Sequence, residues 1–203
     1  MLDFLDRTRG LFERLSRYAT WVGGASLLLA AVMVTIDVLC RKFLNVTMSG
    51  SDEISGYVFA ASTTWAYSYC LMHRSHIRID AFYNMMPLPV RAVLDVFGVT
   101  LLLVYMAVLT RHAWTAFMTS YEFNSVSITT LATPQWIPQM FWVAGLIMFT
   151  ITLVFVLFHA LVALISRNWQ LVNKVAGIMS VEDVLEEETA GVDVVLTHKG
   201  SKD

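Results

Sequence analysis

Charged residues are scarce in this 203-residue chain. Asp, Glu, Lys and Arg make up 15% of it and hydrophobic residues 57%, with a mean hydropathy of +0.61. A soluble domain has about 25% charged and about 45–50% apolar residues, and a chain this short cannot bury the apolar excess in a larger core. A soluble globular domain and a disordered chain are therefore excluded. The net charge of −2 excludes a generally basic nucleic-acid-binding protein. We expect a membrane protein.

Residues for redox and metal chemistry are also few. The two cysteines, Cys40 and Cys70, fall near opposite ends of predicted membrane-crossing helices, too far apart for a disulfide. The histidines leave one alternative open, a b-type cytochrome-like electron carrier that holds haem between His73 or His76 and His159. His73 and His76 lie in a cation-rich loop rather than inside an apolar run, and no third ligand completes a zinc site. We expect no cofactor, no metal and no catalytic residues, and therefore no enzyme.

Four apolar segments are each long enough to cross the hydrocarbon core, which takes about 20 residues. They cover approximately residues 19–40, 54–73, 92–117 and 137–165. Eleven of the fourteen Lys and Arg residues lie before the first segment, between the second and third, or after the fourth. Because cations mark the cytoplasmic side, we expect both termini in the cytoplasm.

The segments outside the predicted spans differ in kind. Residues 1–18 place apolar side chains at helical spacing opposite arginines, which predicts an amphipathic helix in the cytoplasmic headgroup layer. Residues 19–167 form the membrane domain, and residues 168–203 form an acidic cytoplasmic tail of a kind that is usually solvated. The predicted fold class is all-α, an integral membrane four-helix bundle with an N-terminal amphipathic interfacial helix.

Three ionisable residues lie at the edge of the first two spans. Asp37 and Arg41 are four residues apart on one helix face and can neutralise each other. Glu53 begins the second span on the same side, within reach of Arg41. We interpret the three as a structural ion pair that fixes the hairpin, because a proton or ion relay would place its acids deeper in the bilayer. No span has the proline-broken or glycine-unwound centre of a transport site, so we predict that this chain transports nothing by itself.

Small residues recur on the first two spans at helical spacing. The second span carries Gly56, Ala60, Thr64 and Ser68, and the first carries Gly23 and Ala30. Such stripes let helices approach closely where lipid gives no hydrophobic drive for association. They serve either packing within the bundle or contact with a partner, and the sequence leaves both open.

Four features in order resemble the small permease subunit (DctQ type) of tripartite ATP-independent periplasmic (TRAP) transporters. Arg41 closes the first span and Glu53 opens the second. The stretch from Met72 to Asp80 is similar to the family's Gly-x-His-Ile-x-Val-Asp stretch, and Thr133-Pro-Gln-Trp-Ile-Pro138 opens the fourth span.

Within the family-like loop, His76 and Asp80 occupy the family's His and Asp positions, whereas Ser75 stands where the family usually has glycine. The resemblance covers roughly residues 15–167.

The resemblance implies a role and partners. It implies a bacterial inner-membrane scaffold in the lipid bilayer for a large permease subunit (DctM type), which carries the substrate and sodium sites. A periplasmic substrate-binding protein (DctP type) would deliver a small organic solute, often a carboxylate, for sodium-coupled uptake. Asp52, Glu53 and Glu122 lie on predicted periplasmic loops and could contact that binding protein.

Overall fold

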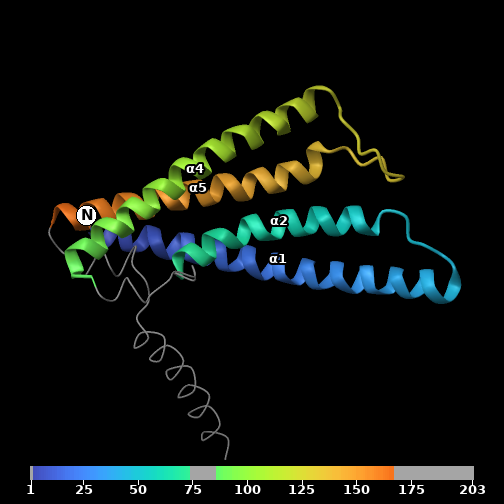
Figure 1. Ribbon diagram of the computed structural model, residues 1–203, viewed down its shortest axis with the longest axis horizontal. Coiled ribbons are helices and arrows are strands. Elements are labelled where there is room, and N and C mark those ends of the chain that lie inside the picture. Colours follow the sequence, from blue (N-terminus) through green and yellow to red (C-terminus); the bar gives the residue numbers. More distant parts are fainter. Residues whose placement is uncertain (1, 74–85, 167–203) are drawn as a thin grey trace, which may run out of the picture.

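The computed structural model describes residues 2–73 and 86–166 (Figure 1). Its helices are α1 (Leu2–Leu44), α2 (Ser51–Met72), α4 (Leu88–Glu122) and α5 (Trp136–Ile165). Within these described ranges the one β feature is an isolated bridge between Val126 and Pro134. The all-α fold class predicted from the sequence is confirmed.

The helices contact one another in the order α1, α2, α5, α4, so that spatial neighbours are not always sequence neighbours. They are spread out in this order toward the right of Figure 1, whereas α4 crosses over α5 toward the left. α1 packs against α2, α2 also packs against α5, and α5 packs against α4. α1–α2 and α4–α5 are antiparallel pairs, whereas α2 and α5 run parallel. Loops 45–50 and 123–135 lie together at one end of the molecule, which we call the loop end.

Three of the described helices are long and apolar enough to cross a membrane, over Glu13–Leu44, Pro89–Glu122 and Trp136–Ile165. α2, predicted as the second span, does not reach the same apolarity because serine, threonine and tyrosine interrupt it. Several of these polar side chains are buried, among them Ser62, Thr64 and Ser68. A helix between two others can hide polar groups against its neighbours, so the crossing by α2 stays a prediction.

α1 is longer than the predicted first span. One continuous helix of 43 residues runs from Leu2 to Leu44, so the predicted amphipathic segment 1–18 continues into the predicted span without a helical break. Its placement in the headgroup layer stays a prediction, as do the predicted domain boundaries. The acidic tail, residues 168–203, lies outside the described residues.

The α4–α5 contact follows a seven-residue spacing. The buried positions of α4 include Ala92, Val99, Met106, Ala113 and Ser120, each seven residues after the last. Such a repeat keeps one stripe of a helix facing its neighbour. The apolar residues of this seam belong to a buried apolar cluster that also contains residues of α5 such as Leu146, Phe149 and Leu153.

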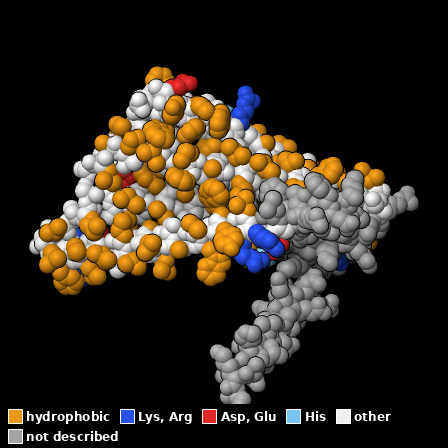
Figure 2. Space-filling model, turned by 180° about the vertical axis from the view of Figure 1, so that it is seen from behind, with side chains coloured by type: hydrophobic (Ala, Val, Ile, Leu, Met, Phe, Trp, Pro, Cys, Tyr) orange, Lys and Arg blue, Asp and Glu red, His pale blue; other side chains and the backbone are white. Residues whose placement is uncertain are grey.

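The outward faces of the helices are strongly apolar. Figure 2 shows hydrophobic side chains over most of the visible surface of the described helices, with few charged ones between them. Trp21 on α1 is 76% exposed, and Phe97 on α4 is 59% exposed. Such contiguous apolar surface marks contact with lipid or with another membrane protein.

Candidate functional site

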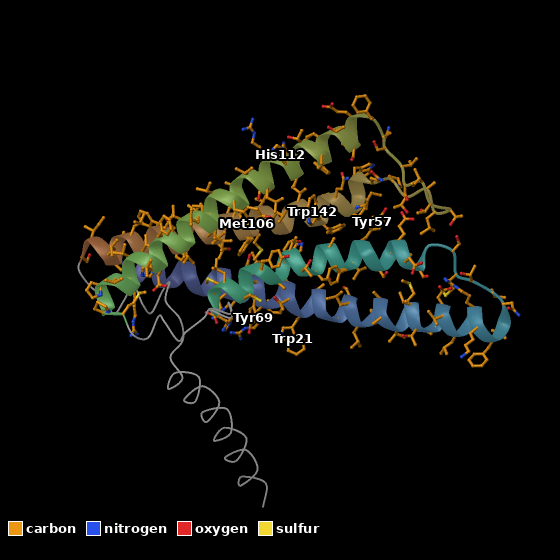
Figure 3. All side chains as sticks on the ribbon, in the orientation of Figure 1. Trp21, Tyr57, Tyr69, Met106, His112 and Trp142 are labelled. Carbon is orange, nitrogen blue, oxygen red and sulfur yellow. The ribbon has the colours of Figure 1, made fainter. Side chains whose placement is uncertain are left out.

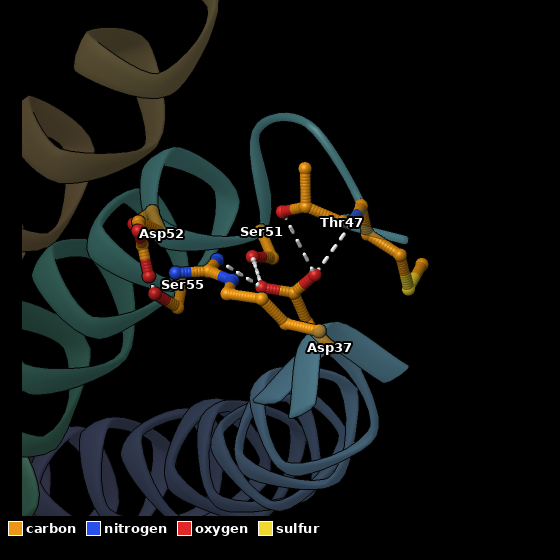
Figure 4. Close-up of polar contacts among 7 residues, drawn as sticks. Asp37, Thr47, Ser51, Asp52 and Ser55 are labelled. Carbon is orange, nitrogen blue, oxygen red and sulfur yellow. Dashed lines mark hydrogen bonds and ion pairs between the residues drawn. The ribbon is translucent and has the colours of Figure 1, made fainter. Parts of the chain in front are cut away.

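Asp37 lies at the centre of a polar cluster at the loop end (Figure 4). It is 1% exposed, and its carboxylate accepts hydrogen bonds from the Met48 backbone N–H at 2.6 Å and the Ser51 hydroxyl at 2.9 Å. Arg41 donates to the same carboxylate at 2.7 Å, and the Thr47 hydroxyl lies at 3.4 Å. The structure thus brings together Asp37 and Arg41, the first two members of the predicted ion pair.

These contacts give Asp37 a structural task. A buried charge is costly unless it is paired and hydrogen-bonded, and here donors from loop 45–50 and from the start of α2 meet the carboxylate. Asp37 therefore fastens the loop and the first turn of α2 onto α1. A carboxylate engaged in this way is poorly suited to carry protons or ions.

Glu53 occupies a second polar cluster, between α2 and loop 123–135. Tyr57 donates to its carboxylate at 2.6 Å, and the Thr129 hydroxyl donates to its other oxygen. Hydrogen bonds from Thr129 and then Tyr57 lower the pKa of Glu53 from its ordinary value. Within the described residues no ion pair joins Glu53 to Arg41, so the third member of the predicted ion pair links α2 to loop 123–135 instead.

Contact between the two loops completes the loop end. The hydroxyls of Ser49 and Thr130 are hydrogen-bonded to each other, and the side chain of Leu131 covers Gly50. Gly50 has φ 93°, a left-handed conformation that glycine adopts without strain, and a Cβ there would collide with Leu131. The two helical pairs are therefore joined at this end by complementary loops.

The predicted small-residue stripes are used largely inside the bundle. Gly23 of α1 meets Ser62 of α2, whose hydroxyl donates to the Gly23 carbonyl at 3.1 Å. Thr64 packs against Gly145 of α5, where an added Cβ would lie 2.8 Å from the Thr64 Cβ. Ala30 is also buried.

The other stripe residues on α2 differ from one another. Ser68 is 1% exposed, whereas Ala60 is half-buried. Gly56 is exposed, and a Cβ added to it would meet nothing within 4 Å. The stripe therefore faces α5 at one end of the helix and stays open at the other.

Sequence reasoning missed the partners of these stripes. The sequence patterns do not single out Ser62 or Gly145, nor the hydrogen bond from the Trp65 indole to the Phe141 carbonyl at 2.9 Å. A lone glycine inside the long apolar run of α5 was the one available signal for Gly145, because glycine weakens a helix unless close packing requires it.

The remaining predicted site residues are scattered. Asp52 and Glu122 are exposed at the loop end, whereas His76 and Asp80 lie outside the described residues. Tyr57 and Trp142 line a small cavity of about 220 Å³ between α2 and α5 (Figure 3). A larger apolar groove of about 450 Å³ lies between α1 and α2, and Trp65 is among its lining residues.

We next consider whether side chains that could bind a metal ion lie together in the described part of the chain. Over residues 2–73 and 86–166, no three His, Cys, Asp or Glu side chains are grouped to hold a metal ion. His159 is buried on α5, where its ring lies 6.3 Å from that of Phe155. His73, at the end of α2, lies 3.9 Å from the Glu13 carboxylate.

The fold and these clusters define a helical membrane protein whose polar groups tie its own helices together. Residues 30–167 match the family model of the tripartite ATP-independent periplasmic transporters, DctQ component. The match covers more than half of the chain, and the chain belongs to this family, as the sequence motifs predicted. Comparisons with curated proteins and with solved structures returned no match. The family is a transporter component and not an enzyme family, and the cytochrome-like alternative gains no support.

Proposed function

We propose that this chain is the scaffold subunit of a TRAP transporter, holding the large permease subunit in place during sodium-coupled uptake of a small organic solute, often a carboxylate. The observation that carries the proposal is the state of Asp37. This buried acid is engaged by groups of its own hairpin, which suits a rigid support better than an ion path. A mobile transport domain needs a neighbour that does not move with it, and the apolar outer faces offer membrane-embedded contact area.

The open end of the α2 stripe is our proposed contact for the large subunit. An exposed glycine at Gly56, beside half-buried Ala60, would let a partner helix approach closely. On the periplasmic side we propose Asp52 and Glu122 as contacts for the binding protein, because both are exposed at the loop end. Glu53 is a weaker candidate, since its carboxylate is engaged with Tyr57 and Thr129.

The family and the cation bias together support placement in the bacterial inner membrane with both termini in the cytoplasm. In that orientation the loop end faces the periplasm, where a binding protein would dock.

Co-purification of the large subunit with the tagged chain tests the partnership and the contact face. We expect wild-type chain to retain the large subunit, Gly56→Phe to retain much less, and Gly98→Phe on α4, where nothing lies within 4 Å of an added Cβ, to retain as much as wild type. Equal retention by both variants would contradict the proposed face. Failure of wild-type chain to retain the large subunit would contradict the scaffold function itself.

A further inference from the structure

Contacts between neighbouring helices fix how far each is displaced along its neighbour. Gly23 of α1 is level with Ser62 of α2, because the Ser62 hydroxyl bonds to its carbonyl. Thr64 of α2 is level with Gly145 of α5, against which it packs. Since each residue advances a helix by about 1.5 Å, these pairs set a common axial scale for α1, α2 and α5.

α4 joins the same scale through one contact with α5. The hydroxyls of Thr110 and Thr150 lie 2.9 Å apart. Because α4 and α5 are antiparallel, residues of α4 before Thr110 are level with residues of α5 after Thr150, toward the end opposite the loop end (Figure 1).

Charged residues bound the apolar runs of α1 and α4 at both ends. The run of α1 lies between Arg17 and Asp37, and that of α4 between Arg91 and Arg111, with buried Asp95 inside the latter. α5 is free of Asp, Glu, Lys and Arg over its whole length. The midpoints of these runs are residue 27 on α1, residue 101 on α4 and residues 150–151 on α5. On α2, the midpoint between Glu53 and the end of the helix falls near residue 63.

The midpoints do not lie at one level along the bundle. The contacts above give, for each midpoint, the α5 residue that lies at the same height along the bundle. The midpoint of α1 is level with about residue 139 of α5, that of α2 with about residue 144, that of α5 itself is at about residue 150, and that of α4 is level with about residue 159. They shift steadily in one direction across the row, by about 20 positions or about 30 Å in total. At most three spacings between adjacent helices, each about 9 Å, separate the axes of α1 and α4, and the separation narrows where α4 crosses over α5 (Figure 1). A plane through the midpoints is therefore inclined by at least about 45° to one that cuts the helices squarely.

We propose that the bundle crosses the phospholipid bilayer obliquely, with its helix axes tilted by about 45° from the membrane normal in the plane of the helix row. The bilayer centre then meets α1 nearer the loop end and α4 nearer the opposite end. This inference concerns the lipid surface that the protein fits, and it holds whether or not the scaffold function is correct.

The length of α5 supports the same angle independently. Its 30 residues extend about 45 Å, and a 45° tilt projects this onto about 32 Å, close to the hydrocarbon thickness of about 30 Å. An upright bundle centred on α1 and α2 would leave the last turns of α5 in water, where Phe158 is 51% and Ile165 82% exposed. The shorter runs of α1 and α4 are bounded by Arg17, Arg91 and Arg111, whose long side chains can reach the headgroups, and by Asp37, which is paired with Arg41.

Nitroxide labels on single cysteines test the proposal in the full chain, reconstituted in phosphatidylethanolamine–phosphatidylglycerol vesicles after Cys40→Ala and Cys70→Ala. Leu28→Cys and Val104→Cys place labels on exposed positions about 27 Å apart along the axis, and we expect equal immersion depths within a few ångströms. Val22→Cys and Thr115→Cys place labels at one axial level, and we expect depths that differ by about 20 Å. Immersion depth is measured from the ratio of the nitroxide's collision rate with oxygen to its collision rate with a water-soluble nickel chelate. The reverse pattern, equal depth for the level pair and a large difference for the other, would overturn the proposal.

Polarised infrared spectroscopy of the unsubstituted chain in aligned bilayers provides a second test that no substitution can disturb. We expect the helix amide band to report a mean tilt above about 35°, compared with about 20° for membrane helices on average. A mean tilt below about 35° would overturn the proposal.

Discussion

The two antiparallel helix pairs are held together by different chemistry. Hydrogen bonds join α1 to α2 and to the loop between them, where Asp37 binds loop 45–50 and Ser62 bonds to the Gly23 carbonyl. α4 and α5 instead meet along an apolar seam of seven-residue spacing, to which a hydrogen bond between Thr110 and Thr150 is added. The difference follows from position. α2 lies between α1 and α5, so its polar groups can be satisfied by protein, whereas α4 at the edge of the row must present apolar side chains to its surroundings.

The largest loss of stability is expected from a change at Asp37, because its carboxylate holds the α1–α2 pair together. Asp37→Ala leaves the Met48 N–H, the Ser51 hydroxyl and Arg41 without their shared acceptor. We expect a loss of about 3 kcal/mol in the free energy of unfolding, measured by SDS titration in detergent micelles. Asp52→Ala, which removes an exposed acid of the same loop end, is the control and should change stability by less than about 0.5 kcal/mol. Equal losses would show that the cluster is not what holds the α1–α2 pair.

The joint between the two pairs is the next most sensitive place. In Gly145→Ala the new methyl group would lie 2.8 Å from the Thr64 Cβ and 3.0 Å from Trp65, so that α2 must move away from α5. We expect a loss of about 1–3 kcal/mol, measured by thermal unfolding. Gly98→Ala on α4 meets nothing within 4 Å and should be neutral or stabilising by up to about 1 kcal/mol, because alanine favours the helix. A higher unfolding temperature for Gly145→Ala than for Gly98→Ala would contradict the close contact at this joint.

Single hydrogen bonds between helices should contribute much less. Ser62→Ala removes the hydrogen bond to Gly23 between α1 and α2, and Thr110→Val removes the hydrogen bond to Thr150 between α4 and α5. We expect each to cost about 0.6 kcal/mol in unfolding by SDS. If Thr110→Val cost several times more than Ser62→Ala, the contrast between a polar and an apolar pair would be wrong.

The smallest effect is expected from the pH dependence of the loop end. The pKa of Glu53 is lowered in the folded protein by hydrogen bonds from Thr129 and Tyr57. Its contribution to stability is therefore present above the ordinary glutamate pKa and is lost as the pH falls through the lowered value. Glu53→Gln should weaken the fall in unfolding temperature over this acidic window, whereas Glu122→Gln, an exposed acid, should not. Superimposable pH profiles for Glu53→Gln and wild type would contradict the assignment.

Much of this fold is predictable from the sequence, because a helix that crosses a bilayer needs a long apolar segment that is easy to recognise. The sequence predicts the start of α5 at residue 137, and the helix begins at Trp136, since Pro138 and a long uncharged run define it. The spacing of Asp37 and Arg41 predicts a local ion pair, and a guanidinium nitrogen of Arg41 lies 2.7 Å from a carboxylate oxygen of Asp37. Both depend on neighbours along the chain, which sequence patterns describe well.

Contacts between distant segments cannot be predicted in the same way. The sequence assigns Glu53 to Arg41, but Thr129 hydrogen-bonds to Glu53 from a loop 76 residues further on, and no local pattern announces that meeting. The two ends of the α2 stripe differ for the same reason. Thr64 faces Gly145, whereas Gly56 stays open, and only the order of the helices in the row decides which residues are covered.

Uptake by proteoliposomes tests the central claim most directly. Vesicles would contain the large subunit alone, the large subunit with this chain, or this chain alone, each with binding protein and labelled solute outside and an inward sodium gradient. We predict uptake only when both membrane subunits are present. Full uptake by the large subunit alone, or by this chain alone, would contradict a scaffold that supports transport without forming its path.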